Sequence, residues 1–105
     1  MFPKAWRTIF GESPMKYKII YTGGYNKRAG KFLKKHPEML KQYGKTLSLL
    51  ELNPHHPSLR MHPLKGKLSD LHSVSINMSY RITLTFLITD KAIIPVDIGS
   101  HNEVY

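Results

Sequence analysis

Residues 80–99 alternate between apolar and polar side chains, with an interruption near residue 90. The apolar set is Ile82, Leu84, Phe86 and Ile88 on the first arm and Ile94, Val96 and Ile98 on the second. A period of two predicts two half-buried strands joined as a hairpin. Both apolar sets must share one face, so a three-residue loop at 90–92 is expected, pairing 88 with 94, 86 with 96 and 84 with 98. This register places Arg81 opposite His101 on the polar face.

A short strand and two helices are expected ahead of this hairpin. Residues 17–22 form a compact strand candidate that Gly23 and Gly24 end. Residues 25–35 carry apolar side chains at helical spacing, with basic residues on the other face. Pro37 suits the first position of a second helix, in which Leu40, Tyr43, Leu47 and Leu50 follow a helical rhythm.

A further strand is predicted at 71–78, with Val74, Ile76 and Met78 facing the core. A turn centred on Ser79 would place Ser75 across from Thr83 and Asn77 across from Arg81. Pro95 lacks a backbone donor, which suits an edge or a bulge better than a central strand.

This order of elements predicts an α+β domain: a strand, a two-helix hairpin, and then three mainly antiparallel strands, with the helices on one sheet face. Residues 1–14 contain two prolines and no sustained period, so they are interpreted as an N-terminal arm or extension. Residues 15–105 are expected to form one domain with a single core.

The amino-acid composition gives the chain a high net positive charge. Sixteen Lys and Arg against seven Asp and Glu give a net charge of +9, which favours a nucleic acid or an acidic protein as partner. There is no cysteine, which is compatible with a reducing, cytoplasmic setting. No apolar run approaches the roughly 20 residues of a membrane span, so no membrane partner is expected. The first ten residues are too interrupted for a signal peptide.

Three short motifs follow the predicted helices: HPLKG at 62–66, YRITL at 80–84 and GSHNEVY at 99–105. In this order and spacing the chain resembles the RelE/ParE superfamily of bacterial toxins, most closely its RelE and YafQ-like branches. The resemblance covers residues 15–105. It implies a small α+β domain of the microbial-ribonuclease type, an acidic antitoxin as partner, and ribosome-dependent cleavage of messenger RNA.

The resemblance also implies residue roles. Arg81 matches the arginine that contacts the scissile phosphate, His101 the YafQ-type catalytic histidine, Tyr105 the terminal aromatic residue, and His62 the histidine of the HPL segment. Three further residues are assigned to RNA binding: Lys65, Lys67 and His72. Four positions depart from the pattern. Ser75 and Ser79 replace a histidine and an aspartate of YafQ-like members, and Val74 and His72 replace two lysines of RelE types.

These residue types suit metal-independent RNA cleavage, in which the neighbouring 2′-hydroxyl attacks the phosphate. Histidine can act as acid or base near neutral pH, and arginine presents a forked donor to phosphate oxygens. The sequence leaves the acid or base role of His101 open. His62 also fits a residue that shapes the loop before Pro63, and His72 fits a hydrogen-bonded structural histidine.

No cofactor is expected, and no metal site, because His55, His56 and His62 have no regular ligand spacing. Two alternative functions remain open. One is a ParE-like toxin that poisons a topoisomerase without catalysis, and the other is an RNA-binding homologue without activity.

Overall fold

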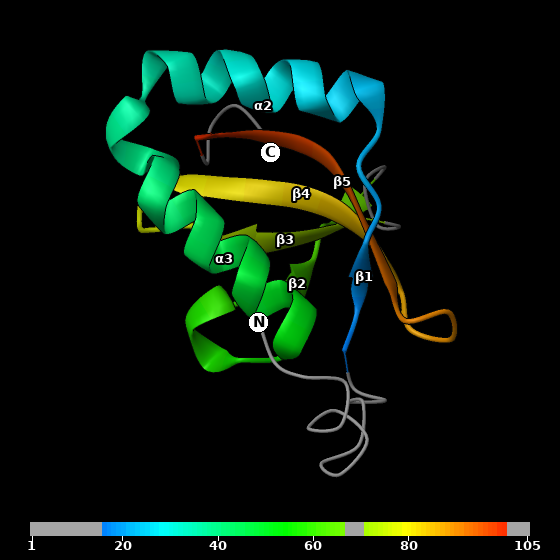
Figure 1. Cartoon of the computed structure of the whole chain (residues 1–105). Coiled ribbons are helices and arrows are strands. Elements are labelled where there is room, and N and C mark those ends of the chain that lie inside the picture. The colour runs from blue at the N-terminus through cyan, green and yellow to red at the C-terminus, as the bar shows by residue number, and fades with distance from the viewer. Residues whose placement is uncertain (1–15, 67–70, 101–105) are drawn as a thin grey trace, which may run out of the picture.

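The computed structural model describes residues 16–66 and 71–100. Five strands form one sheet in the order β1-β5-β4-β3-β2, and both helices pack on the same face of it (Figure 1). This confirms the predicted α+β architecture. The predicted arm at 1–14, Lys67, His101 and Tyr105 lie outside the described residues.

Strand β1 (Lys18–Ile19) is an edge strand that pairs in parallel with β5, matching Lys18 with Ala92 and Ile19 with Ile93. It is shorter than the predicted strand at 17–22. Ile19 is buried, whereas Ile20 is 39% exposed. The two helices carry the chain from β1 at one edge of the sheet to β2 at the opposite edge.

Helix α2 (Gly23–Lys35) begins two residues earlier than predicted, and Thr22 caps it by accepting a hydrogen bond at Oγ1 from the Tyr25 backbone N–H at 3.2 Å. Tyr25, Ala29 and Phe32 face the core, as the periodicity predicted. Pro37 opens the 3₁₀ turn η1 (Pro37–Met39), which continues directly into α3 (Leu40–Leu52). The periodicity was wrong at Leu40, which is 61% exposed.

Strands β3 (His72–Ser75) and β4 (Tyr80–Leu87) are antiparallel and pair Ser75 with Arg81 and Ser73 with Thr83. The predicted register, with Ser75 opposite Thr83, is therefore wrong by two positions. The cause is the connection: Asn77 Oδ1 accepts hydrogen bonds from the backbone N–H groups of Ser79 and Tyr80 at 2.8 and 2.9 Å. This side-chain-mediated turn ends β3 at Ser75. Met78, predicted to face the core, is 92% exposed.

Strand β5 (Ala92–Ser100) pairs with β4, but the register differs from the predicted one. The connecting turn comprises residues 88–91, and Lys91 adopts a positive φ of 50°. A bulge follows: Leu84 pairs with Pro95 and Thr83 with Asp97, which leaves Val96 as the extra residue. Pro95 thus borders a bulge, as expected for a residue without a backbone donor.

The bulge and the turn together place Arg81 opposite Gly99. The predicted pairing of Arg81 with His101 is therefore wrong. The predicted pairs 88 with 94, 86 with 96 and 84 with 98 are wrong for the same reason. The predicted face is wrong as well at Ile94, which pairs with Thr85, whereas Ile93, opposite Phe86, is fully buried. Loop length and the bulge therefore decide the partner of a β5 side chain and, ahead of the bulge, also its face.

Two short elements lie in the segment predicted as a proline-rich connection. These are the 3₁₀ turn η2 (Pro57–Leu59) and the edge strand β2 (His62–Pro63), which pairs His62 with Ser73 and Pro63 with His72. A two-residue strand has no periodicity of its own, so the sequence did not predict it.

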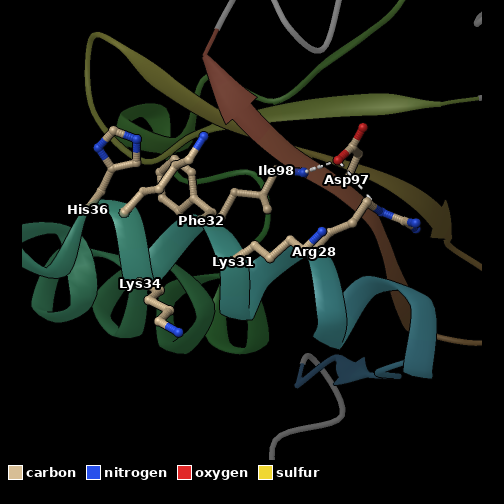
Figure 2. Close-up of a pocket in the computed structure, with 8 residues that line it drawn as sticks. Arg28, Lys31, Phe32, Lys34, His36, Asp97 and Ile98 are labelled. Carbon is tan, nitrogen blue, oxygen red and sulfur yellow. Dashed lines mark hydrogen bonds and ion pairs between the residues drawn. The ribbon is translucent and has the colours of Figure 1, made fainter.

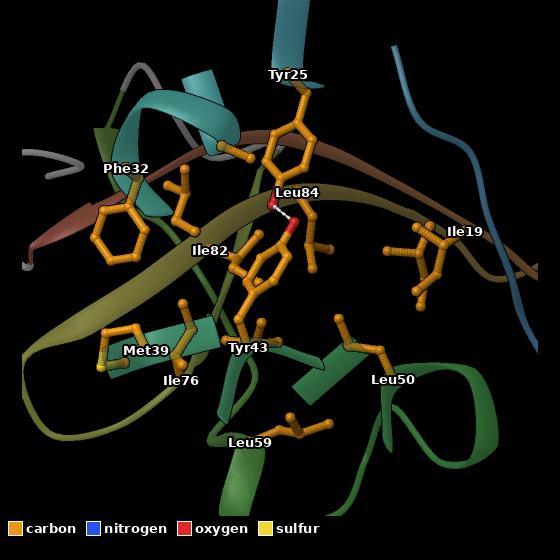
Figure 3. Packing of buried hydrophobic residues seen from close by; sticks show 14 residues of the cluster. Ile19, Tyr25, Phe32, Met39, Tyr43, Leu50, Leu59, Ile76, Ile82 and Leu84 are labelled. Carbon is orange, nitrogen blue, oxygen red and sulfur yellow. Dashed lines mark hydrogen bonds between the residues drawn. The ribbon is translucent and has the colours of Figure 1, made fainter. Parts of the chain in front are cut away.

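The core lies between the helices and the sheet (Figure 3). Tyr25 from α2 and Tyr43 from α3 point toward one another there, with their hydroxyl oxygens 2.8 Å apart. Burial raises the pKa of both phenols above the ordinary value of 10.0. Within the described ranges, no helix is long and apolar enough to cross a membrane.

Candidate functional site

The sheet has two chemically different faces. Ile82, Leu84 and Val74 point toward the helices and are fully buried. The opposite face, here called the polar face, carries two rows of residues matched across the strands. One row is His62, Ser73, Thr83 and Asp97, and the other is Ser75, Arg81 and Gly99.

Arg81 is the cation at the centre of the polar face. It is partly buried, and its Nη1 donates a hydrogen bond to Ser73 Oγ at 3.2 Å. The guanidinium therefore extends across β3 from its position on β4. Ser73, itself fully buried, lies directly opposite His62 of β2. Two predicted site residues thus lie on either side of Ser73. His62 is aligned with it by the register, and Arg81 reaches it through its side chain.

His62 is held by the chain just before it. Its Nδ1 lies 2.9 Å from the carbonyl oxygen of Arg60, a residue in the left-handed conformation with φ 49°. In a neutral ring Nδ1–H donates to that carbonyl, which leaves the basic lone pair on Nε2. His62 and Arg81 are separated by one strand and by two residues along it, because His62 aligns with Thr83, so their backbones are about 12 Å apart. Long side chains can approach a common ligand from this distance.

Two of the four positions that depart from the family pattern, Ser75 and Ser79, are serines with local roles. Ser75 Oγ donates to the carbonyl oxygen of Asn77 at 2.6 Å, and the Ser79 backbone N–H donates to the Asn77 side chain. Both serines stabilise the β3–β4 connection. Neither serine supplies a group that titrates near neutral pH. Within the described ranges, the group of this kind on the polar face is the imidazole of His62.

His72 lies on the helix-facing side of the sheet, the side that the parity of its strand predicted, and so apart from Arg81. It pairs with Leu84, and its ring packs edge-on to Phe86 with centroids 5.9 Å apart. Its Nδ1 is buried and has no hydrogen-bond partner. The structural role weighed for His72 therefore fits, but the expected hydrogen bond is absent at this nitrogen.

Of the remaining predicted site residues, the structure describes only Lys65. Lys65 is exposed two residues after β2. Because Lys67, His101 and Tyr105 lie outside the described residues, their roles stay predictions. Within the described part of the chain, no group of three or more His, Cys, Asp or Glu side chains could hold a metal ion.

Sequence reasoning missed Ser73 as the partner of Arg81. The predicted register faced Arg81 with Asn77 instead. A signal was present, because an asparagine two residues before Ser79 can accept from the turn's backbone and widen it.

A two-helix layer on a small mixed sheet is also the fold of several solved bacterial toxins, YafQ among them. YafQ from Escherichia coli BL21(DE3) superposes with a TM-score of 0.68 at 18% identity, covering 86% of this chain and 99% of that one. A metal-bound toxin from Helicobacter pylori gives a TM-score of 0.66 at 26% identity, covering 85% and 99%.

A third neighbour is YafQ in the Escherichia coli DinJ–YafQ toxin–antitoxin complex, with a TM-score of 0.67 at 21% identity, covering 86% of this chain and 98% of that one. No protein-family model matches the sequence, and no curated protein matches it significantly. The likeness of this chain to these toxins is thus a likeness of fold.

Proposed function

We propose that this chain is the toxin of a toxin–antitoxin pair and that it cleaves messenger RNA on the ribosome without a metal. The toxin role is supported by the structural neighbours, which include a toxin bound to its antitoxin. The cleavage role is supported above all by the position of Arg81: its guanidinium lies on the polar face, hydrogen-bonded to Ser73, with His62 across the same serine.

In this proposal Arg81 binds the scissile phosphate and stabilises the charge that develops as the neighbouring 2′-hydroxyl attacks. Its hydrogen bond to the neutral Ser73 orients the guanidinium without neutralising it. His62 is proposed to take part in proton transfer through Nε2, the nitrogen that carries the lone pair when Nδ1–H donates to Arg60.

His101 and Tyr105 enter the proposal on their sequence match alone. His101 is proposed as the main proton-transfer group, and Tyr105 as a proton donor or as a ring that stacks on a base. His101→Gln should keep RNA binding and lose about 100- to 10,000-fold in cleavage, the usual contribution of a general acid or base. Cleavage by His101→Gln within a few-fold of wild type would remove His101 from the site.

The test in cells is induction of the chain followed by mapping of messenger RNA 5′ ends. Wild type should arrest growth and generate new ends in phase with codons, and Arg81→Ala should do neither. Thr85→Ala is a matched control, because Thr85 lies on the same face of β4 about 13 Å along the strand. DNA damage with intact messages would instead support the ParE-like alternative, and the absence of both effects would support the inactive homologue.

A further inference from the structure

Figure 2 shows a groove between helix α2 and strand β5 whose lining contains both signs of charge. Asp97 of β5 lies there among cations of α2 and forms an ion pair with Arg28 at 3.7 Å. An anion that enters this groove therefore meets a carboxylate.

A different groove, here called the α3–β3 groove, lies between helix α3, the segment that begins with η2, and the end of β3. It consists of two compartments of about 590 and 220 Å³. The compartments are continuous, because both are lined by Gln42, Ser58, Ser75 and Ile76.

The α3–β3 groove is open because β2 is short. The β2–β3 ladder pairs His62 with Ser73, and two more residues of the same ladder would bring Arg60 opposite Ser75. Arg60 instead adopts a left-handed conformation with φ 49°, and the ladder stops at His62. The space beside Ser75 is thus left unfilled by a strand.

The charge of the α3–β3 groove is of one sign. Arg60 lines the larger compartment and Lys45 the smaller one, and both side chains are exposed. Neither cation forms an ion pair with a described residue. The described lining residues include no Asp or Glu. A concave surface with cations of one sign raises the local concentration of anions.

The groups that the groove presents to a ligand are mainly hydrogen-bond donors. The Ser75 hydroxyl is engaged in the fold, because its Oγ donates to the carbonyl oxygen of Asn77 at 2.6 Å. The side chains of Arg60, Lys45 and Gln42 are exposed, so a ligand displaces only water from them. Guanidinium and ammonium groups donate and do not accept, which favours a ligand rich in acceptors, such as a phosphodiester chain.

The groove also adjoins the polar face. Ser75 lines the groove and pairs with Arg81, so the two backbones are about 5 Å apart. On the other side, the Arg60 carbonyl oxygen lies 2.9 Å from Nδ1 of His62. A strand of RNA whose phosphate lies on Arg81 can therefore continue past Ser75 into the groove.

We infer that the α3–β3 groove holds the nucleotides next to the scissile phosphate, with one further phosphate on Arg60 and another on Lys45. Met78, which is 92% exposed and lines the larger compartment, offers an apolar contact to a base. The inference rests on the proposed function, because Arg81 must hold the scissile phosphate for the groove to adjoin it.

An acidic peptide fits this groove less well. Peptides that add to a sheet edge rely on a run of backbone hydrogen bonds. Beyond the two positions paired with β2, strand β3 extends only through Val74 and Ser75. This length is too short for a stable added strand.

The binding test uses the full chain labelled with ¹⁵N and two probes that cannot be cleaved. These are the 2′-O-methyl forms of UpU, with one phosphate, and of UpUpUpU, with three. Both probes should shift the backbone amide resonance of Arg81, and only UpUpUpU should also shift the side-chain amide of Gln42. Failure of UpUpUpU to shift Gln42 would overturn the inference.

Charge variants test the two phosphate contacts. Arg60→Gln and Lys45→Gln should each weaken UpUpUpU binding about two- to fivefold, the usual range for an exposed charge pair. Each should also reduce the slope of log K against log salt by about 0.7, and neither should change the affinity for UpU. Lys41→Gln on α3, which is exposed and outside the groove, should change neither probe. An equal effect of Lys41→Gln and Arg60→Gln on UpUpUpU would contradict the inference.

Tetraglutamate represents the other ligand class. It should not displace UpUpUpU or shift Gln42. If it binds the groove as tightly as UpUpUpU does, the groove is a general site for acidic ligands and the inference is wrong.

Arg81→Ala separates this inference from the proposed function. It should weaken the binding of both probes. If it does so while Arg60→Gln and Lys45→Gln bind UpUpUpU like wild type, the inference is wrong and the proposed function stands. If UpU binding is unaffected by Arg81→Ala, the phosphate site of the proposed function is wrong, whereas weaker UpUpUpU binding by Arg60→Gln would still support the groove as an RNA site.

Discussion

The hydrogen bond between the Tyr25 and Tyr43 hydroxyls connects the two helices inside the core. Tyr25 is fully buried and Tyr43 is 8% exposed, so neither hydroxyl has ready access to water as an alternative partner. Tyr43→Phe therefore leaves the Tyr25 hydroxyl unpaired. We expect it to lower the free energy of unfolding by about 1–3 kcal/mol, the desolvation cost of a buried polar group.

Replacing both hydroxyls removes the pair without leaving an orphan. The double variant Tyr25→Phe/Tyr43→Phe should therefore be more stable than the sum of the two single changes predicts. For a domain of this size, each kcal/mol corresponds to a shift in Tm of about 4–8 °C. Chemical denaturation of the four proteins at neutral pH gives the coupling energy directly.

The same pair predicts a dependence on alkaline pH. Burial, above all, raises the pKa of both phenols from 10.0, so the folded state holds protons that the unfolded chain releases. Their contribution to stability is fully present below pH 10 and is lost as the pH rises through the folded values. The slope is about 1.4 kcal/mol per pH unit for each tyrosine in this window.

Lysines also titrate in this range, so the difference between wild type and the double variant is the relevant quantity. Wild type should lose stability more steeply than the double variant between about pH 9 and pH 11. Additive single-variant costs together with parallel pH profiles would show that the two phenols do not form the buried pair.

Three further changes test other parts of the structure. Thr22→Ala should destabilise the chain by about 1 kcal/mol through loss of the α2 N-cap, and Thr22→Ser should restore most of it, as measured by thermal unfolding. Asn77→Ala removes the acceptor for two backbone N–H groups and should cost about 1–3 kcal/mol, whereas Asn77→Asp keeps both hydrogen bonds; equal losses in the two variants would contradict the turn described above. Binding of single-stranded RNA should weaken steeply with salt. If Lys65 contacts one phosphate, Lys65→Ala should reduce the slope of log K against log salt by about 0.7. An unchanged slope would place Lys65 outside the RNA interface.

The sequence predicted most of the elements because their periodicities are long enough to read. Helix α2 repeats buried positions over about two turns, from Tyr25 to Phe32, and β4 alternates from Tyr80 to Phe86. The register between the strands was predicted wrongly. It depends on the turn held by the Asn77 side chain and on the bulge at Val96, and neither changes the apolar pattern of the strands that it connects.

In the candidate site, too, the sequence predicted the face of Arg81 but not its partner. Arg81 was placed correctly on the polar face, because strand parity decides the face. Its partner Ser73 was not predicted, and its assignment opposite His101 was wrong, because partners depend on register. His72 lies on the helix side, as the parity of its strand predicted.

The measurement that tests the central claim most directly is cleavage of messenger RNA on programmed ribosomes by the purified chain under single-turnover conditions. Wild type should cleave, and Arg81→Ala should be slower by about 100- to 1,000-fold, the usual effect of removing one donor that stabilises transition-state charge. Arg81→Ala should lower the free energy of unfolding by about 1–3 kcal/mol, because the hydroxyl of the buried Ser73 loses this donor, so its folded state is checked by thermal unfolding. Thr85→Ala should cleave like wild type. An Arg81→Ala protein that is folded and cleaves within a few-fold of wild type would contradict the assignment of the polar face as the site of RNA cleavage.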